Sequence, residues 1–292
     1  MSRLKLGLPK GSLEQSTTEL FAQAGWNIVS RTRNYFPVVD DPELQCTLVR
    51  SQEMALYVAQ GTLDLGLTGL DWIIEQGCQD KVVEVCDLVY SKSSNQACRW
   101  VLVVPENSSI HNINDLNGKK IATELVNFTR NYLLERGIQA EVEFSWGATE
   151  AKVVEGLVDA AVEITETGST IRAHGLRIVC DLLHTHTRLI ANPQAMADPW
   201  KKEKIAQIAL LLQASLEARH KVILKMNVPS DCIDPVVALL PSLRAPTVSH
   251  LHKTDWLAVE TVVDRSMVRD LLPRLQQAGA QGILEYNLQK VI

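Results

Sequence analysis

Short apolar runs alternate with helical patterns over the first two thirds of the 292-residue chain. Residues 4–8 and 45–49 each have the length and apolar content of a strand, and apolar residues at helical spacing follow each of them. Gly11 turns the first strand into a helix, for which Ser12 and Gln15 predict a capping box. Strands that alternate with helices indicate a parallel sheet with covered faces.

The same scheme repeats once more in this first block. A helix begins at Ser51 and ends before Gly61, and a strand over 63–67 leads into a turn at Thr68 and Gly69. The first block is therefore built from successive strand and helix units.

The pattern restarts near residue 100. Strands are predicted over residues 101–104, 121–123, 142–146 and 160–165, with helices over 128–136 and 149–157. A strand over 188–191 and a helix over 198–219 then return the chain to the first block. We expect two α/β lobes around a cleft, of the kind found in periplasmic binding proteins. The first lobe would comprise residues 1–98 and 187–220, and the second residues 99–186.

Residues 221–292 show a different order of elements. Strands are predicted over 221–228, 246–252, 256–263 and 282–288, and helices over 231–240 and 266–278. The order βαββαβ is the split arrangement of ferredoxin-like domains. Alternation at Val259, Thr261 and Val263 allows a central strand to bury one face. We expect residues 221–292 to form an independent third domain.

Composition is that of ordinary globular domains. Hydrophobic residues make up 46% and charged residues 22%, which excludes disorder and fibrous repeats. The net charge of −5 and the lack of a basic cluster argue against a nucleic-acid partner. We see no secretory signal and no apolar stretch near the roughly 20 residues that a bilayer requires. We therefore expect a cytoplasmic protein with no membrane partner.

Cysteine and histidine spacing predicts no metal site built from side chains. The six cysteines contain no Cys-x-x-Cys pair, so we interpret them as reduced, mostly buried thiols. His184 with His186, and His250 with His252, could each share one face of a strand, but no third ligand follows at useful spacing.

The segment 162–172 is the most informative part of the sequence. An apolar strand leads into acidic residues, then Thr-Gly-x-Thr, and then the start of a helix. Backbone N–H groups at such a helix start bind anions, and Gly168 permits close approach of a phosphate. Donors and acceptors for a ribose 5-phosphate would be the hydroxyls of Thr167, Ser169 and Thr170 and the carboxylates of Glu163 and Glu166. A capped turn with no ligand remains the alternative.

This segment resembles the phosphoribosyl pyrophosphate loop of the ATP phosphoribosyltransferases. Further segments resemble that family in the same order, over nearly the whole chain: residues 8–13, 49–50 with 57–58, 64–71, 117–123, 172–176, 245–247 and 255–256. Two positions depart from its pattern, because many members have Asp in place of Glu163 and a different residue in place of Ser12.

The resemblance implies a reaction in which N1 of ATP attacks C1 of phosphoribosyl pyrophosphate and releases pyrophosphate, as the first step of histidine synthesis. The ring nitrogen carries a lone pair, so the reaction requires alignment and charge stabilisation rather than a base. Mg²⁺ would be bound mainly through the pyrophosphate. Lys10 and Arg50, at strand ends, are the candidate catalytic cations, and Gly69 and Asp71 are expected to line the same cleft.

The third domain resembles the amino-acid-binding regulatory domain (ACT-like) of the family's long form. Position in that resemblance places Asn227, Leu243, Thr247 and Gly282 around a histidine that inhibits the enzyme. An amide at Asn227, where relatives have Asp, predicts weaker histidine binding. The family also implies homodimers that assemble into homohexamers.

Three other functions fit parts of the sequence. Two lobes around a cleft also suit a solute-binding or sensor protein, although no export signal is present. A noncatalytic regulatory subunit would retain the fold without turnover. A nucleobase phosphoribosyltransferase would leave the last third of the chain unexplained.

Overall fold

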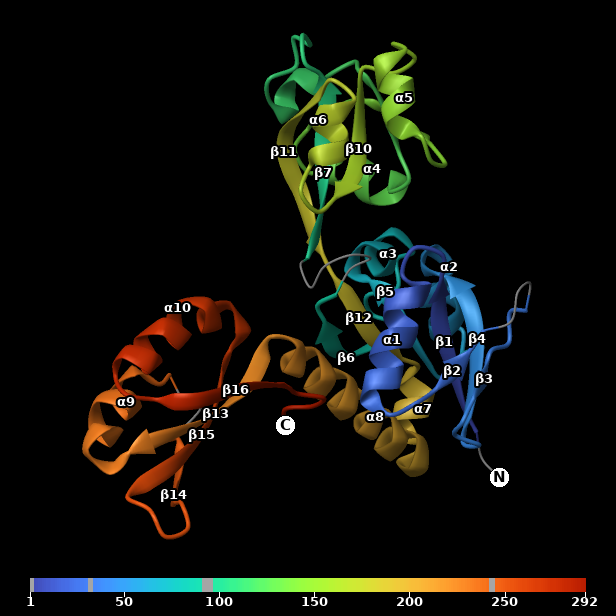
Figure 1. Cartoon of the computed structure of the whole chain (residues 1–292). Coiled ribbons are helices and arrows are strands. Elements are labelled where there is room, and N and C mark those ends of the chain that lie inside the picture. The colour runs from blue at the N-terminus through green and yellow to red at the C-terminus, as the bar shows by residue number, and fades with distance from the viewer. Residues whose placement is uncertain (1–2, 31–33, 91–96, 242–244) are drawn as a thin grey trace. The chain divides into compact units, whose positions relative to one another are not determined.

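The computed structural model describes residues 3–30, 34–90, 97–241 and 245–292. The chain divides into two compact units, residues 1–22 with 26–209 and residues 23–25 with 210–292. The division falls within the long helix α8 (Pro199–Arg219). The first unit contains both α/β lobes, and the second contains the βαββαβ region (Figure 1).

The first lobe is built on a five-stranded sheet of order β4-β1-β5-β12-β6. Its strands are β1 (Leu4–Lys10), β4 (Leu44–Arg50), β5 (Leu65–Gly69), β6 (Val83–Leu88) and β12 (Thr187–Ala191). Its helices are α1 (Glu14–Ala24), α2 (Ser51–Ala59), α3 (Leu70–Glu75) and α7 (Pro193–Ala197), and a small hairpin consists of β2 (Ile28–Val29) and β3 (Val38–Val39). The predicted parallel pairing is confirmed for β4, β1 and β5, whereas β12, by which the chain returns to this sheet, runs antiparallel to both β5 and β6.

Register places the ends of the parallel strands at one edge. Leu4, Leu6 and Leu8 are buried along β1, and β1 pairs with β4 residue by residue up to Lys10 opposite Arg50. β5 runs parallel to β1 and leads directly into α3. Side chains from three successive units therefore meet at the carboxyl edge of the sheet, where open α/β sheets bind ligands.

The second lobe is built on a sheet of order β11-β7-β10-β8-β9. Its elements are β7 (Cys98–Pro105), β8 (Lys120–Thr123), α4 (Val126–Leu134), β9 (Glu141–Phe144), α5 (Thr149–Val154), β10 (Ala160–Thr165), α6 (Ser169–Ala173) and β11 (Leu176–Thr185), with a 3-10 turn η1 (Ile113–Leu116). Trp100 and Leu102 of β7 pack in one core cluster, whereas Val101 and Val103 pack in another. β7 is thus buried on both faces, which explains its continuous apolar run.

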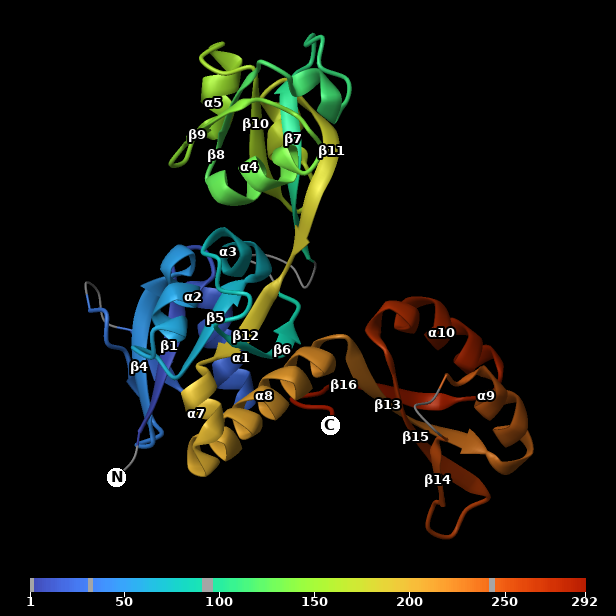
Figure 2. The same ribbon diagram turned by 180° about the vertical axis from the view of Figure 1, so that it is seen from behind.

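The chain passes between the two sheets twice, once between β6 and β7 and once between β11 and β12. On the return, His186 alone separates β11 from β12. Figure 2 shows this run as a nearly continuous ribbon from the second sheet into the first.

The second unit confirms the ferredoxin-like order. Its elements are β13 (Lys221–Pro229), a 3-10 turn η2 (Ser230–Cys232), α9 (Ile233–Leu239), β14 (Thr247–His250), β15 (Trp256–Asp264), α10 (Arg265–Gln277) and β16 (Gln281–Asn287). The sheet order is β14-β15-β13-β16, with every neighbouring pair antiparallel. Alternate residues of β13 and β15 are buried in a core with α9 and α10, which cover one face of the sheet (Figure 1).

Several local expectations differ from the structure. Helix α1 begins at Glu14, and the Gln15 amide donates to Glu19 instead of completing a capping box with Ser12. The turn expected at Thr68 and Gly69 is instead the end of β5. The six cysteines are free, but fewer are buried than expected, since full burial is found only at Cys46 and Cys78. None of the described helices combines the length and apolar character that crossing a membrane demands.

Candidate active site

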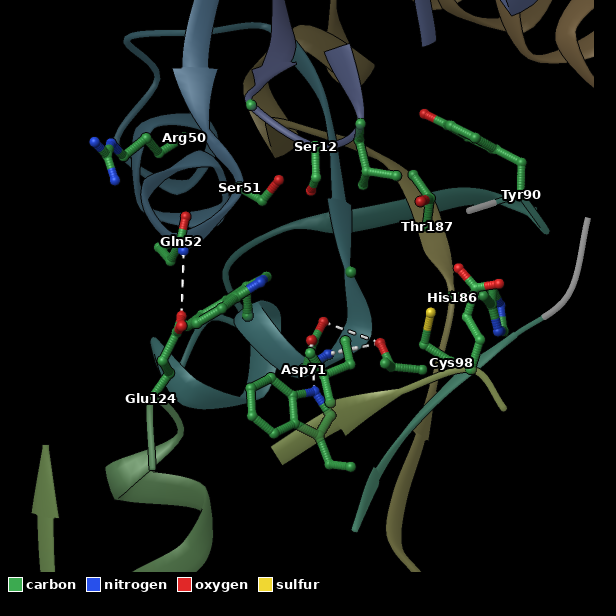
Figure 3. A pocket seen from close by; sticks show the side chains of 18 of the residues that line it. Ser12, Arg50, Ser51, Gln52, Asp71, Tyr90, Cys98, Glu124, His186 and Thr187 are labelled. Carbon is green, nitrogen blue, oxygen red and sulfur yellow. Dashed lines mark hydrogen bonds between the residues drawn. The ribbon is translucent and has the colours of Figure 1, made fainter. Parts of the chain in front are cut away.

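A cavity of about 590 Å³ lies at the carboxyl edge of the first sheet (Figure 3). It brings together five of the residues that the sequence singles out: Lys10, Arg50, Gly69, Asp71 and Glu166. Residues of the second lobe, including Trp100 and Glu124, complete its wall.

Lys10 and Arg50 are neighbours across the β1–β4 ladder. The Lys10 ammonium lies 3.7 Å from the centre of the Tyr35 ring, and the Arg50 guanidinium carbon lies 4.9 Å from the centre of the Trp146 ring. An aromatic face attracts a cation without neutralising its charge. Both cations therefore remain able to bind a phosphate.

Asp71 is a buried connection between the two lobes rather than an exposed cleft residue. Its side chain is 2% exposed and accepts a hydrogen bond from Trp100 Nε1 (2.8 Å) and another from Thr185 Oγ1 (2.9 Å). Burial raises the pKa of Asp71, although the bonds from Trp100 and Thr185 act to lower it. Figure 3 shows Asp71 among the side chains that line the cavity, with dashed lines for its hydrogen bonds.

The Asp71 carboxylate also explains why residue 69 is a glycine. A Cβ atom at this position would lie 2.0 Å from Asp71 Oδ1. Any side chain at residue 69 would therefore displace Asp71 from Trp100 and Thr185.

Two further contacts connect the lobes. The carboxylate of Glu75, at the end of α3, accepts from the backbone N–H groups of Asn127 (3.0 Å) and Phe128 (2.9 Å) in the first turn of α4. Such a carboxylate complements the positive end of a helix. Gln52 Nε2 donates to Glu124 Oε2 over a longer distance of 3.4 Å.

The Thr-Gly loop joins β10 to α6. Gly168 has φ +74°, and its N–H donates to Thr165 Oγ1 (2.8 Å). Thr167 and Ser169 share a hydrogen bond through their hydroxyls (3.1 Å). Glu166 lines the cavity, whereas residues 167–170 lie outside its lining.

Backbone geometry favours glycine at position 168, and two side chains lie close to it. A Cβ there would lie 3.0 Å from Ile178 Cδ1 and 3.1 Å from Arg172 Nη1. The left-handed φ adds strain for any other residue.

Glu163 lies apart from the cavity lining, in the half-buried middle of β10. Burial, together with the like charges of Glu150 and Glu124, raises the pKa of Glu163 to about 8, against the lowering effect of a hydrogen bond with Thr149. This carboxyl group is therefore largely protonated at neutral pH in the absence of a cationic ligand.

Several cavity residues were not identified from the sequence. They are Gln52, Trp72, Tyr90, Cys98, Trp100, Glu124, Thr185 and Thr187, and His186, which the sequence offered only as half of a His-x-His pair, joins them. Most belong to the second lobe or to the strands that connect the lobes, and no local motif marks them. Their position depends on how the two sheets are joined.

The candidate histidine-binding residues of the second unit are only partly gathered. Asn227 faces Gln281 across the β13–β16 ladder, and a Cβ on Gly282 would lie 3.7 Å from Asn227 Nδ2. Thr247 lies on β14, on the far side of β15 from β13. A cavity of about 630 Å³ includes Gly282 but neither Asn227 nor Thr247. Leu243 lies outside the described residues.

Comparisons with known proteins agree over the whole length of the chain. A family model described as ATP phosphoribosyltransferase matches residues 50–214, and one described as HisG, C-terminal domain, matches residues 218–290. ATP phosphoribosyltransferases of Desulfatibacillum aliphaticivorans and Solidesulfovibrio magneticus are 59% and 58% identical, each covering 99% of this chain and 98% of the relative.

A solved structure extends this similarity to three dimensions. The ATP phosphoribosyl transferase (HisG:HisZ) complex from Thermotoga maritima contains a chain that is 27% identical, with a TM-score of 0.62. The match covers 73% of this chain and 98% of that one. The family models and the near-full-length relatives show that this chain belongs to the ATP phosphoribosyltransferase family.

Proposed function

We propose that this chain transfers the 5-phosphoribosyl group of phosphoribosyl pyrophosphate to N1 of ATP, with release of pyrophosphate, as the first step of histidine biosynthesis. The observation that carries the proposal is the cavity whose lining includes Lys10 and Arg50 from the first lobe and Glu166 from the second. Cations that can bind phosphates thus share one cavity with a carboxylate that can bind ribose hydroxyls.

In this proposal the Thr-Gly loop holds the 5-phosphate through Thr167, Gly168, Ser169 and Thr170. Glu166, directly after β10, accepts from the ribose hydroxyls, and Glu163, one methylene longer than the commoner Asp, lies on β10 itself. The lining includes Thr165 and Glu166 but none of residues 167–170, so in this proposal the 5-phosphate lies outside the cavity and the ribose at Glu166.

Lys10 and Arg50 carry the electrostatic part of the mechanism. Negative charge develops on the pyrophosphate as its bond to C1 breaks, and fixed cations lower the free energy of that transition state. Mg²⁺ would arrive bound to the pyrophosphate and neutralise part of the same charge, and the oxygen donor of Glu166 is of the type this ion prefers. Asp71 positions the walls through its hydrogen bonds with Trp100 and Thr185.

The test is to incubate the full-length protein with ATP, phosphoribosyl pyrophosphate and Mg²⁺ and to follow the ultraviolet absorbance of phosphoribosyl-ATP. We expect product only when both substrates are present. Binding of both substrates without product would instead identify a noncatalytic member of the family, and binding of an unrelated solute alone would favour a binding protein.

We further propose a division into catalytic residues 1–98 with 187–220, catalytic residues 99–186 and a histidine-binding regulatory region, residues 221–292. The sheet of the regulatory region is complete without strands from the first unit, which supports an independent sensor. Asn227 and Gly282 lie close enough to contact one small ligand. Thr247 lies two strands from Asn227, about 10 Å away, so one histidine would have to bridge them or bind where copies of the chain meet.

Histidine titration of the intact protein and of a 1–220 truncation tests this assignment. Inhibition requires that histidine binds one state better than another, so we expect it to inhibit the intact protein alone. Equal inhibition of a folded truncation would contradict it. Sedimentation of the intact protein tests the homodimers and homohexamers that the family implies.

A further inference from the structure

Helix α1 belongs to both compact units of the chain. It begins at Glu14 in the first unit, and its last residues, Gln23 and Ala24, belong to the second. Residues 10–13, directly before the helix, line the active-site cavity. One short helix therefore begins at the proposed active site and ends in the unit that contains the proposed regulatory region.

The Gln23 side chain uses both of its polar atoms within the second unit. Its Nε2 donates to the carbonyl of Ser215 (3.0 Å) and to that of Gln289 (3.2 Å), and its Oε1 accepts from Arg219 Nε (3.1 Å). Ser215 and Arg219 lie one turn apart on α8, and Gln289 belongs to the tail, residues 288–292, that follows β16. One amide therefore joins the end of α1 to α8 and to the tail.

The tail continues the strand that carries one of the proposed histidine contacts. Gly282 lies near the start of β16, and the tail follows the end of the same strand. The tail is also held by the backbone N–H of Val291, which donates to the carbonyl of Ala214 on α8 (3.0 Å). A shift of β16 along its own direction would therefore move Gln289, an acceptor of Gln23.

The body of α1 has a second connection to the active-site cavity. Thr17 and Tyr90 are 1% and 2% exposed, and their hydroxyls share a hydrogen bond of 2.7 Å. Tyr90 itself lines the cavity. Leu20 and Phe21 are fully buried on the same helix. Because packed interiors yield little and transmit strain, α1 would move as one rigid element.

We propose that α1 couples the regulatory unit to the active site, with Gln23 as the coupling residue. The inference rests on the proposed function. Histidine binding favours one position of β16 and its tail, and Gln23 passes that position to α1. Coupling requires an element with two arrangements that each ligand biases, and here that element is α1 with residues 10–13.

Lys10 is the group whose position matters most in this mechanism. Its interaction with the departing pyrophosphate weakens as the distance grows, so a displaced loop stabilises the transition state less. Gly11 gives the loop freedom to adjust, because it has φ +107° and open space around its Cα. Inhibition therefore acts through the placement of a cation, without any inhibitor in the catalytic cavity.

Gln23→Leu tests the coupling, because it keeps the approximate size of the side chain and removes three hydrogen bonds. We expect the histidine concentration for half inhibition to rise about tenfold, with the Kd of histidine from calorimetry and the uninhibited kcat unchanged. Gln15→Leu is the matched control, since Gln15 is an exposed glutamine of the same helix that bonds only within it, to Glu19. It should leave all three quantities unchanged.

Two results with Gln23→Leu would overturn the inference. Unchanged inhibition would show that the amide transmits nothing. A Kd of histidine that rises as much as the inhibitory concentration would show that Gln23 supports the histidine site instead of coupling it to catalysis.

Hydrogen exchange, read by mass spectrometry, tests the same coupling without turnover. Because coupling is reciprocal, phosphoribosyl pyrophosphate should change the exchange of the tail amides in the wild type and in Gln15→Leu, but not in Gln23→Leu. This measurement decides the question even in a protein that histidine does not inhibit. A wild type that forms phosphoribosyl-ATP but shows no response in the tail would overturn the coupling alone, whereas a wild type that forms no product would contradict the proposed function.

Discussion

Two buried carboxyl groups, one in a wall of the active-site cavity and one beside it, have different neighbours. In the first wall, formed by the first lobe, burial raises the pKa of Asp71, and hydrogen bonds from Trp100 and Thr185 act against that rise. In the second lobe, burial also raises the pKa of Glu163, but there the like charges of Glu150 and Glu124 add to the rise.

This difference shows which carboxyl group is satisfied without substrate. Both oxygens of the Asp71 carboxylate accept hydrogen bonds within the fold, so the first wall is preorganised. The like charges around Glu163 would be relieved by a cation, and the reaction supplies positive charge on the ribose as the bond to pyrophosphate breaks. That transient positive charge would therefore favour the ionised form of Glu163.

The largest effect is expected from Gly168→Val in the Thr-Gly loop of the second lobe. The left-handed backbone strains a β-branched residue by about 1–3 kcal/mol, and the new side chain also meets Ile178 and Arg172. Calorimetry should show affinity for phosphoribosyl pyrophosphate falling by more than about 100-fold.

Gly175→Val is the matched control, because Gly175 has a similar φ of +69° but open space around it. If both variants kept the wild-type affinity, the loop would not be the phosphate site. Equal losses in both would trace the effect to backbone strain alone.

Asp71→Ala, in the first wall, should reduce the free energy of unfolding by about 3 kcal/mol, because the donors of Trp100 and Thr185 lose their acceptor. Asp71→Asn keeps one acceptor and should lose less. Urea denaturation measures both. A smaller effect for Ala than for Asn would show that the carboxylate does not hold the lobes.

Lys10→Ala should lower turnover about 30-fold while weakening ATP binding only a few fold, as expected for a cation that acts on departing pyrophosphate. Lys10→Arg keeps the charge and should recover part of the rate. Steady-state kinetics and ATP calorimetry separate the two quantities. Equal losses in rate and binding, or none, would rule out a transition-state role.

The smallest effect is expected from Glu163→Gln. The pKa of Glu163 is raised from 4.5 to about 8, so the folded state binds the proton more tightly, and the wild type loses stability as pH rises through this window. The amide does not ionise, so the Tm of the variant should equal that of the wild type near pH 5 and exceed it near pH 8, by about 1–2 kcal/mol in stability. Parallel Tm curves would mean that Glu163 is not desolvated.

Local sequence patterns identified the strands and helices whose signal is continuous. The apolar runs of β1, β4 and β7 and the whole βαββαβ order were predictable, because each strand buries a regular set of residues. β11 was missed because polar residues interrupt its sequence, Leu176–Thr185, and its pairing with β7 joins residues far apart in the chain.

The candidate site divides in the same way. Lys10 and Arg50 could be found because strand ends gather at one edge of a parallel sheet. The role of Asp71 could not, since its partners Trp100 and Thr185 lie 29 and 114 residues away along the chain. That Trp146 is exposed could not be predicted from the sequence either, because tryptophan side chains are highly buried on average.

The ladder between β7 and β11 has a consequence for protein engineering. Cys98, the first residue of β7, lies directly opposite Thr185, the last residue of β11. The second lobe is therefore an insertion whose first and last residues are paired neighbours on adjacent antiparallel strands. Its sheet contains no strand from outside the segment. Residues 98–185 should be excisable as an autonomous folding module, and a different α/β module with similarly spaced ends could be grafted at the same two points.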